Sequence, residues 1–562
     1  MLDLHPNSSS DSCTRPADTA ALPFFNFICF RIYRRGNRMI VSTVILSAIV
    51  ATVGSQNLAN SFFAETGTNA GFVTRINAKG FDLVGDYLRE RVVKFMQNEL
   101  AFNLSAILTN NVHFSLVSNR ITQFEERSFV STFSSQQGKG FVWTGSGLNA
   151  TINAVFRVDA PTGQSTGHAP LSFDNTVVEL LLWTGVNGDG HLKTDLVTCK
   201  VAANNVRLQF AATDADAISP FLPHISQFIT ERIEQTICPT FHSELVPVIS
   251  NRLLNTPLSA ALFDQYFLNY GLIGPVQFSE KELFMRHRGN AFGILRQGRT
   301  RLNDFRLPFR SPPLDIPPTP SKHTLDFYMS NYTISSLLFW MDQYRKFDYE
   351  ISKSAQNNSA ISGYLRTDCP TDDICAGTLF PALKERFPNG LVMIKSHTVS
   401  YPRLIVTPGN ATMLVDTRCD AFVQQGEKSR RFLTASMAVE VKLEEPRFKD
   451  YVLYAKMHIE KFTINEVASL VDGIDKNSLE FLVNALTELI LQEEMATKLK
   501  GIRLPIMFDF DQQWSEVVYE QDRLRISADY CYGQKCSTPV VSESNDKATD
   551  SDYYDDLKGS DS

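Results

Sequence analysis

The stretch RINAKGFDLVGDYLRERVVKFMQNEL, from Arg75 to Leu100, combines apolar and charged residues with helical spacing. Its apolar residues recur every three or four positions and would form one stripe on a helix: Val84, Leu88, Val92, Phe95 and Met96. Charged residues such as Asp86 and Lys94 would face the other way. The stretch therefore predicts a long amphipathic helix that lies on an apolar surface.

The sequence that follows this helix has the pattern of antiparallel strands and then of a second helix. From Asn111 to Phe210 apolar residues recur with a period of two, as in NNVRLQF at the end of the segment. A helical pattern begins at about Ser219 and carries Ile225, Phe228, Ile229, Ile233 and Ile237, with a bend expected at Pro239. A return strand within YGLIGPVQFSEKELFMRHRG closes this first half.

The second half of the chain repeats the same order of elements. A short apolar segment, ISSLLFWMDQY, precedes strands such as SMAVEVKLEE, in which Met437, Val439 and Val441 alternate with polar residues. A long helix is expected in NSLEFLVNALTELILQEEMATKLK, from Asn477 to Lys500, before a final return strand. The halves share almost no sequence identity, so the matched order predicts an internal duplication at the scale of a domain.

A proline-rich stretch, RSPPLDIPPTPSKH, separates the two halves. Proline fixes φ and lacks an amide donor, so this segment is expected to be extended and to stay out of a central strand. If one sheet holds both halves, the segment is a strap over a fixed interface and not a hinge. The predicted organisation is a signal-peptide region at 1–55, an N-terminal barrel domain at 56–309, the linker at 310–323, a C-terminal barrel domain at 324–540 and an acidic tail at 541–562.

Composition and charge limit the class of protein. The 562 residues are 43% hydrophobic and 20% charged, enough for more than one large core. The formal net charge of −7 leaves no basic face for nucleic acid. The tail at 541–562 carries seven acidic residues and two lysines, a net of −5, and is expected to be disordered.

The start of the chain has the pattern of a secretory signal. RIYRRGNR, from Arg31 to Arg38, precedes the apolar run MIVSTVILSAIVATV, and small residues follow. Cleavage after Ser55 is expected, and translation from Met39 is an open alternative. A signal anchor is the other interpretation, but the run is shorter than the roughly 20 residues that span a bilayer. The protein is therefore predicted to be secreted and extracellular.

Secretion makes the cysteines and the asparagine sequons interpretable. After loss of the signal, close spacing predicts the pairs Cys369–Cys375 and Cys531–Cys536, with Cys199 and Cys238 as a long-range candidate pair and Cys419 left over. The histidines are not spaced as zinc ligands and there is no CxxC, so no metal is expected. Five N-x-S/T triplets predict glycosylation at Asn103, Asn149, Asn331, Asn357 and Asn410.

No motif of a known catalytic site stands out. There is no G-x-S-x-G, HExxH, Walker loop or G-x-G-x-x-G after a strand, and TGSG at Thr144 to Gly147 has the pattern of a hairpin. No catalytic residue and no cofactor are therefore predicted, and a secreted esterase or lipase is a remote alternative. The apolar helices could pack on a solid core or line a tunnel for acyl chains, and composition does not decide between these.

Several stretches in one order resemble the family of bactericidal/permeability-increasing protein, lipopolysaccharide-binding protein and the plasma phospholipid and cholesteryl-ester transfer proteins. They run from about Ala70 to Tyr532. The opening GFVTRINAKGFDLVGDYLRE resembles the first helix of the family, and the Cys199 to Cys238 spacing resembles the family's one disulfide. The remaining similar stretches are LNYGLIGPVQFSEKELFMRHRGNAFG, DFYMSNYTISSLLFWM, FPALKERFPN and YPRLIVTPGNATMLV.

The resemblance implies an α+β fold of two pseudo-symmetric barrel-like domains. Each domain would pack a long helix on a highly twisted antiparallel sheet, and a central β-sheet would join them into a boomerang. It also implies one apolar pocket per half for the acyl chains of a phospholipid. The residues expected to bind lipid are Phe81, Val84, Tyr87, Leu88, Phe95, Phe228, Ile229 and Ile233 in the first half, and Leu337, Met341, Leu482, Leu486 and Leu489 in the second.

The resemblance leaves two main functions, a lipid carrier and a lipopolysaccharide-binding defence protein. Binding of that anionic glycolipid would need clustered basic residues at the tip of the first barrel. The expected tip hairpins carry Arg120, Arg127, Lys139 and Arg157, diluted by Glu125, Glu126 and Asp159. This composition favours neutral or zwitterionic lipids. A phospholipid, and a lipoprotein or membrane surface, are the expected partners, and a scaffold protein that transfers nothing is a third possibility.

Overall fold

The computed structural model describes residues 69–536, except 100–101, 109–111, 119–120, 126–128, 137–139, 162, 210–218, 264, 281, 294–306, 352–358, 371, 487–500, 505–509 and 534–535. All described residues belong to one compact unit that spans 58–562. The predicted signal at 1–55 and the acidic tail at 541–562 lie outside the described residues. Among the helices that are described, none combines the length and hydrophobicity that a membrane span needs.

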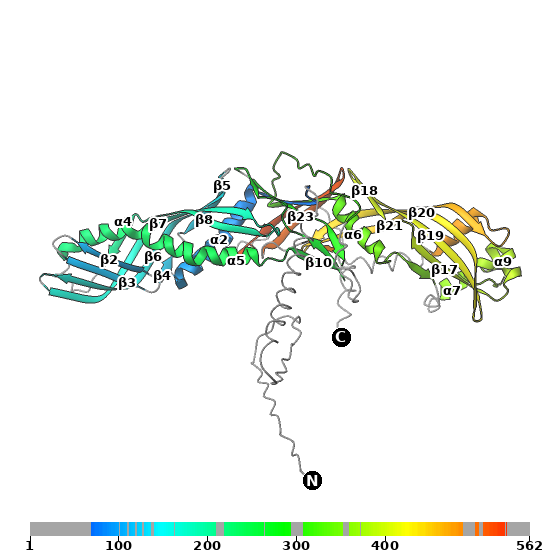
Figure 1. Ribbon diagram of the computed structural model, residues 1–562, viewed down its shortest axis with the longest axis horizontal. Helices are drawn as coiled ribbons and strands as arrows, with labels where there is room; N and C mark the ends of the chain where they lie inside the picture. The colour runs from blue at the N-terminus through cyan, green and yellow to red at the C-terminus, as the bar shows by residue number, and fades with distance from the viewer. Residues whose placement is uncertain are drawn as a thin grey trace, which may run out of the picture. The chain divides into compact units, whose positions relative to one another are not determined.

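An eight-stranded antiparallel sheet forms the N-terminal half, the described part before residue 310 (Figure 1). Its strands follow the period-two pattern of the sequence, and the inward-facing residues of the two longest strands are buried. The strands are β2 (Phe102–Leu108), β3 (Val112–Ser118), β4 (Ile121–Glu125), β5 (Val130–Gln136), β6 (Gly140–Ala160), β7 (Gly163–Val186), β8 (Leu192–Ala202) and β9 (Asn205–Leu208).

Helices cover this N-terminal sheet. The amphipathic stretch forms α2 (Ala78–Glu99), which packs on β5, while α4 (Leu222–Thr240) and α5 (Val246–Leu254) run along β8. The expected bend near Pro239 is a π-helical turn, η4 (Phe241–Leu245), that links α4 to α5, and the short 3-10 helix η3 (Ser219–Phe221) precedes α4. Strands β10 (Ser259–Phe263), β11 (Tyr266–Asn269) and β14 (Ala291–Gly293) form a separate small sheet.

A seven-stranded antiparallel sheet forms the C-terminal half, the described part after residue 323. It contains β16 (Tyr349–Ile351), β17 (Leu391–Thr398), β18 (Arg403–Thr407), β19 (Asn410–Gln425), β20 (Lys428–Lys449), β21 (Val452–Ser469) and β22 (Ile502–Arg503). The helices of this half are α6 (Asn331–Gln343), α7 (Ser359–Tyr364), α8 (Ala376–Leu379), α9 (Pro381–Arg386) and α10 (Lys476–Leu486).

A six-stranded central sheet joins the two halves. Its order is β12 (Gln277–Phe278), β13 (Glu282–His287), β1 (Phe72–Asn77), β15 (Leu325–Ser330), β24 (Arg523–Cys531) and β23 (Asp511–Glu520). Strand β1 from the N-terminal half pairs on one side with β13 and on the other with β15 from the C-terminal half. The predicted fold class, two helix-covered antiparallel sheets joined by a central sheet, is confirmed in these features.

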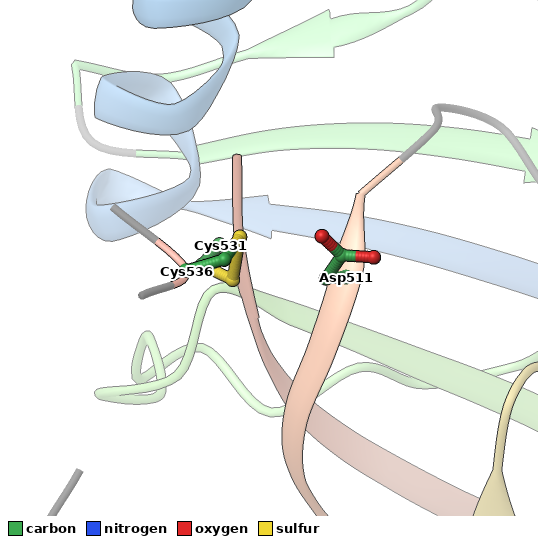
Figure 2. Close-up of side chains that lie close together, drawn as sticks. All are labelled: Asp511, Cys531 and Cys536. Atoms are coloured by element: carbon green, nitrogen blue, oxygen red, sulfur yellow. A yellow bond between two sulfur atoms is a disulfide. The ribbon is translucent and has the colours of Figure 1, made fainter. Parts of the chain in front are cut away.

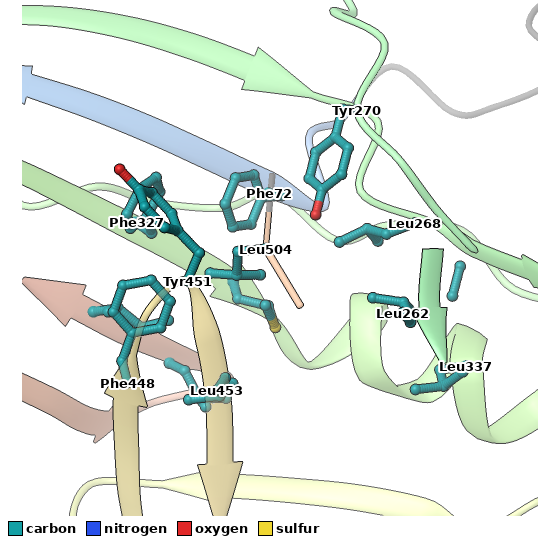
Figure 3. Packing of buried hydrophobic residues seen from close by; sticks show 14 of the residues in the cluster. Phe72, Leu262, Leu268, Tyr270, Phe327, Leu337, Phe448, Tyr451, Leu453 and Leu504 are labelled. Atoms are coloured by element: carbon teal, nitrogen blue, oxygen red, sulfur yellow. The ribbon is translucent and has the colours of Figure 1, made fainter. Parts of the chain in front are cut away.

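One hydrophobic core also crosses the junction. Figure 3 shows Phe72, Leu268 and Tyr270 from the N-terminal half beside Phe327 and Phe448 from the C-terminal half. The rings of Phe72 and Phe327 stack with their centroids 5.8 Å apart. Removing this shared apolar surface from water favours association of the halves at about 25 cal/mol for each Å² that is buried.

A buried polar layer crosses the same sheet. The fully buried Arg75 of β1 donates from Nε to Glu282 Oε2 of β13 at 2.7 Å. On the other side of β1, Asn77 donates to Asp326 Oδ2 of β15 at 2.8 Å, and Ser527 of β24 donates to Asp326 Oδ1 at 2.7 Å. These contacts fix the register of strands that come from different halves, because a slip would leave buried polar groups without partners.

The proline-rich linker forms neither helix nor strand and is hydrogen-bonded to this sheet. Arg75 Nη1 donates to the carbonyl oxygen of Pro317 at 2.9 Å, and Asn77 Nδ2 donates to Ser321 Oγ at 3.0 Å. The side chains of Leu314 and Ile316 pack on a small apolar cluster of the central sheet. The linker is therefore a bound strap whose contacts are made by both side chains and backbone.

Cutting the strap should leave the halves together. We expect a protein with a protease site inserted at the exposed Thr319 to elute at the volume of the intact chain after cleavage, because the central sheet and the shared core remain. Size-exclusion chromatography under native conditions, followed by a denaturing gel, checks this. Two separately eluting fragments would show that the linker itself holds the halves.

A buried histidine in β13 makes stability depend on pH. His287 Nδ1 donates to the carbonyl oxygen of Tyr270 at 2.8 Å, and the Thr74 hydroxyl lies 3.2 Å from Nε2. Burial lowers the pKa of His287 from 6.5 to about 4. The unfolded chain therefore binds the extra proton first, and we expect the free energy of unfolding to fall as pH drops from about 6.5 towards 4. Urea denaturation of wild type and His287→Gln across that range checks this, since the variant should lose part of the slope.

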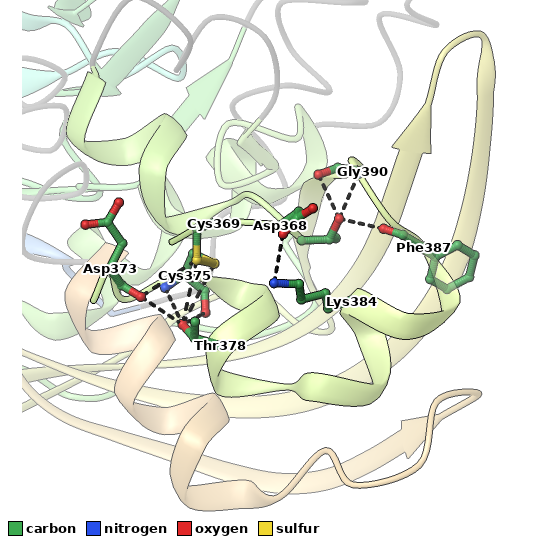
Figure 4. Close-up of a disulfide and its surroundings, with 9 residues drawn as sticks. Asp368, Cys369, Asp373, Cys375, Thr378, Lys384, Phe387 and Gly390 are labelled. Carbon is green, nitrogen blue, oxygen red and sulfur yellow. Dashed lines mark hydrogen bonds and ion pairs between the residues drawn. A yellow bond between two sulfur atoms is a disulfide. The ribbon is translucent and has the colours of Figure 1, made fainter. Parts of the chain in front are cut away.

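The described residues include three disulfides: Cys199–Cys238, Cys369–Cys375 and Cys531–Cys536. The first ties the end of β8 to α4 over a sequence separation of 39 residues. The second closes a loop that leads into α8, where Thr378 hydrogen-bonds to Asp373 and Cys375, and the Lys384–Asp368 ion pair (2.9 Å) lies beside it (Figure 4). Cys419, the cysteine that was left over, is free and buried.

Loss of the long-range disulfide should lower secretion. Opening the Cys199–Cys238 loop should destabilise the protein by about 2–4 kcal/mol, because the unfolded chain regains loop entropy. We expect Cys199→Ala to reduce the secreted yield and the melting temperature. Cys419→Ala is the matched control, since it removes a buried thiol but no cross-link. Normal yield and melting temperature for Cys199→Ala would contradict the structural role.

One predicted helix begins later in the structure, and another is described only in part. The prediction of a helix from Arg75 was wrong for its first three residues: Arg75, Ile76 and Asn77 belong to β1, and the helix begins at Ala78. The physical reason is tertiary, because β1 is hydrogen-bonded on both sides. Of the long helix predicted at Asn477–Lys500, residues 477–486 form α10, and 487–500 lie outside the described residues.

Candidate functional site: an apolar cavity in the C-terminal half

An apolar cavity of about 350 Å³ lies between the C-terminal sheet and its helices. Its volume falls in the range of about 300–1,000 Å³ that ligand pockets occupy. Strands β17, β19, β20 and β21 form its wall, and α6, α10 and the α8–α9 segment contribute apolar side chains. The period-two pattern explains the wall, since Met437, Val439 and Val441 of β20 all face the cavity.

Small side chains leave this space open. Ala411 and Ala421 of β19, Ala435 of β20 and Ala455 of β21 lie among the residues that line the cavity. Ala435 and Ala421 are buried, so the space beside them is enclosed by protein. Larger residues at these positions would fill the interior to the density of an ordinary core.

One part of the wall is polar. Strand pairing aligns Tyr349 of β16, Ser396 of β17 and Cys419 of β19 in one row across the sheet. Two residues further along, Thr398 of β17 lies opposite Thr417 of β19. All five residues line the cavity. We call these five residues the polar patch.

The members of the polar patch hydrogen-bond to one another and to their surroundings. The hydroxyls of Ser396 and Thr417 hydrogen-bond to the Cys419 thiol, and burial raises the pKa of that thiol. Thr417 Oγ1 also lies 3.5 Å from the carbonyl oxygen of Met437. Thr398 Oγ1 donates to Asp342 Oδ1 at the end of α6.

The charged residues that line the cavity are Lys346 and Asp348, as far as the structure describes its wall. Both are exposed, and they follow α6 directly before β16. Arg345 Nη1 lies 3.8 Å from Asp348 Oδ2, a weak surface pair. The cavity thus has a charged, solvent-facing rim next to the polar patch and an apolar interior beyond it.

The structure brings together three of the five residues predicted for the second pocket. Leu337 and Met341 of α6 and Leu482 of α10 line the cavity. Leu486 is the last residue of α10, and Leu489 lies outside the described residues. Whether any of them contacts a lipid stays a prediction.

The residues predicted for the first pocket are divided between two apolar clusters. Phe81 and Tyr87 belong to the core at the junction, where Phe81 packs edge-on against Phe133. Leu88, Phe95, Phe228, Ile229 and Ile233 belong to the core of the N-terminal half. Val84 is half-buried on α2. Their role in binding a lipid also stays a prediction.

The expected basic tip of the N-terminal half is described only in part. Arg157 of β6 forms an ion pair with Asp159, with Nε 3.0 Å from Oδ2. Arg120, Glu126, Arg127 and Lys139 lie outside the described residues, and Glu125 accepts a hydrogen bond from Asn149. The described basic residue is thus neutralised by its neighbour.

The predicted glycosylation sites differ in accessibility. Asn103 of β2 is exposed. Asn149, Asn331 and Asn410 are half-buried, and their side-chain amides already hydrogen-bond to Glu125, Asp522 and Thr412. Asn357 lies outside the described residues.

One group of potential metal ligands occurs within the described ranges. Figure 2 shows Asp511 on β23 beside Cys531 and Cys536. The two sulfurs are joined in a disulfide and supply no thiolate, which is the form that binds zinc. The disulfide instead ties Cys531, the last residue of β24, to Cys536.

Sequence reasoning missed the polar patch. Ser396 and Thr398 alternate with Lys395 and His397, and Thr417 and Cys419 alternate with Arg418. This alternation shows small, uncharged polar residues on one face of each strand. Only the pairing of β17 with β19 places these residues side by side on one face of the sheet.

Comparisons with known proteins agree with this architecture. Residues 261–532 match the sequence profile of the LBP / BPI / CETP family, C-terminal domain. The crystal structure of lipopolysaccharide binding protein superposes with a TM-score of 0.54 at 17% sequence identity, over 83% of this chain and 100% of that one. At that identity the likeness shows the fold alone.

Another solved structure is less similar. P47 of Clostridium botulinum E1 has a TM-score of 0.24 at 9% identity, over 82% of this chain and 99% of that one, too low to support an argument. No curated protein sequence matches the chain.

Proposed function

Because this chain is a member of the LBP / BPI / CETP family, whose C-terminal domain matches residues 261–532, we propose that it is a secreted carrier of phospholipid. The observation that carries the proposal is the cavity in the C-terminal half, with its apolar wall and charged rim. Acyl chains would occupy the interior, and the head group would lie near Lys346 and Asp348. A membrane or lipoprotein surface would be the source or recipient of the lipid.

The energetics of such a site favour binding without chemistry. Burying an acyl chain contributes about 0.8 kcal/mol for each methylene, so ten methylenes supply roughly 8 kcal/mol before the costs of association. Apolar contacts of this kind discriminate weakly between chains that differ by one methylene. No catalytic group and no cofactor are needed for this activity.

Extraction of the purified protein with organic solvent tests the proposal. The protein is secreted from cultured eukaryotic cells, purified without detergent and extracted, and its lipids are identified by mass spectrometry. We expect intact phospholipid in an amount comparable to the protein. An empty extract that stays empty after incubation with phospholipid vesicles would refute the carrier function.

Lipopolysaccharide binding is the second candidate, and the likeness to lipopolysaccharide binding protein is the observation that favours it. The Arg157–Asp159 ion pair reduces the positive charge at the tip of the N-terminal half, which disfavours this function. Binding of lipopolysaccharide that weakens as salt is raised would support the defence function, because screening weakens attraction between phosphates and basic side chains.

A further inference from the structure

The polar patch restricts which lipid fits the cavity. A cavity for acyl chains alone needs only apolar walls, yet Tyr349, Ser396 and Cys419 form a polar row in this one, with Thr398 and Thr417 beside it. Burying a polar group away from water is costly unless it is hydrogen-bonded. The patch lies next to the charged rim, where the polar part of a bound lipid would meet its chains.

The hydrogen-bonding state of the patch shows what it can offer to a ligand. The Thr398 proton is directed to Asp342, the Thr417 proton to Cys419 or to the carbonyl oxygen of Met437, and the Ser396 hydroxyl is bonded to Cys419. Each hydroxyl oxygen still has a lone pair that can accept a hydrogen bond. These three hydroxyls are therefore available to a ligand as acceptors, and a ligand that complements them carries donors.

We propose that the cavity selects a lipid with hydroxyl or amide N–H donors at the junction between its head group and its chains, as sphingolipids have. A glycerophospholipid has only ester oxygens at that level. These oxygens accept hydrogen bonds but cannot donate to the hydroxyl oxygens of the patch. The exposed Lys346 and Asp348 at the rim suit the phosphate and the ammonium of a zwitterionic head group, such as phosphocholine. This inference rests on the proposed lipid-carrier function and adds the class of lipid.

A matched pair of lipids tests it. Sphingomyelin and phosphatidylcholine share the phosphocholine head group and differ in the donors below it. The full-length secreted protein is incubated with vesicles that contain equal amounts of both lipids with matched chains, and the bound lipid is quantified by mass spectrometry. We expect about tenfold enrichment of sphingomyelin, the difference that one or two satisfied buried donors produce.

Variants of the patch connect the selectivity to these residues. Thr417→Val keeps the shape but removes the hydroxyl, and it should bring the ratio of the two lipids close to one. Thr463→Val is the matched control, because Thr463 lies on β21 next to the cavity-lining Phe462 but does not line the cavity itself. The control should keep the wild-type ratio. Equal binding of both lipids by the wild-type protein would overturn the inference.

The buried thiol gives a second readout that does not depend on folding of the variants. Bound sphingomyelin should protect Cys419 of the wild-type protein from alkylation by N-ethylmaleimide, measured on the peptide by mass spectrometry, and phosphatidylcholine should protect it less. Equal protection by both lipids would refute the selectivity and leave the carrier function intact. Absence of any bound lipid would instead refute the carrier function.

Discussion

Ala435→Trp is expected to weaken lipid binding by the C-terminal cavity at least tenfold. Ala435 is 2% exposed and lies opposite Cys419 in the wall, so an indole at this position points into the space that a chain would occupy. Excluding only two methylenes would cost about 1.6 kcal/mol, more than tenfold in affinity. We expect bound lipid, measured after organic extraction, to fall at least tenfold.

The control for this substitution lies on the same strand. Ala438 is half-buried on β20 and does not line the cavity, so Ala438→Trp adds the same indole outside it. This variant should keep the wild-type amount of lipid. If Ala435→Trp retained the same lipid with a normal melting temperature, the cavity would not be the binding site.

Glu282→Leu should destabilise the folded protein by about 3–5 kcal/mol, because it leaves a buried charge without its partner. The Arg75 side chain is 0% exposed, and Glu282 is the carboxylate that pairs with it. The pair joins β1 to β13, and Arg75 also holds the strap through Pro317. Urea denaturation followed by circular dichroism measures the change.

A double variant separates the charge effect from loss of packing. Arg75→Met combined with Glu282→Leu removes both charges, and apolar replacement of a buried ion pair is often close to neutral. We expect the double variant to recover most of the stability lost in Glu282→Leu. A double variant as unstable as the sum of the two single variants would show that the ion pair is not the cause.

The sequence predicts where helices and strands lie better than it predicts which strands pair with each other. The spacing of Val92, Phe95 and Met96 identifies α2, and the alternation in β20 identifies its inward face, because both patterns depend on residues close in sequence. Arg75 and Asn77 looked helical by the same reasoning. They are strand residues because β13 and β15, more than 200 positions away, pair with them.

The cavity was predictable only in outline. The family resemblance implied an apolar pocket, and Leu337, Met341 and Leu482 do line one. The polar patch arises from the register between β17 and β19, and no local pattern determines a register between strands. The cavity itself depends on alanines such as Ala421 and Ala435. Their small size does not predict a cavity, because the sequence does not show which residues lie opposite them.

The central sheet limits how the protein can be divided. Strands β1 and β15 hydrogen-bond to each other across the junction, so a fragment that ends before the strap would expose one edge of β1, and its counterpart would expose one edge of β15. Both edges are flanked by apolar residues of the shared core, including Phe72 and Phe327. Unpaired edges of this kind promote aggregation. Neither half should therefore be soluble when it is made alone, although the two should remain together once the complete chain has folded.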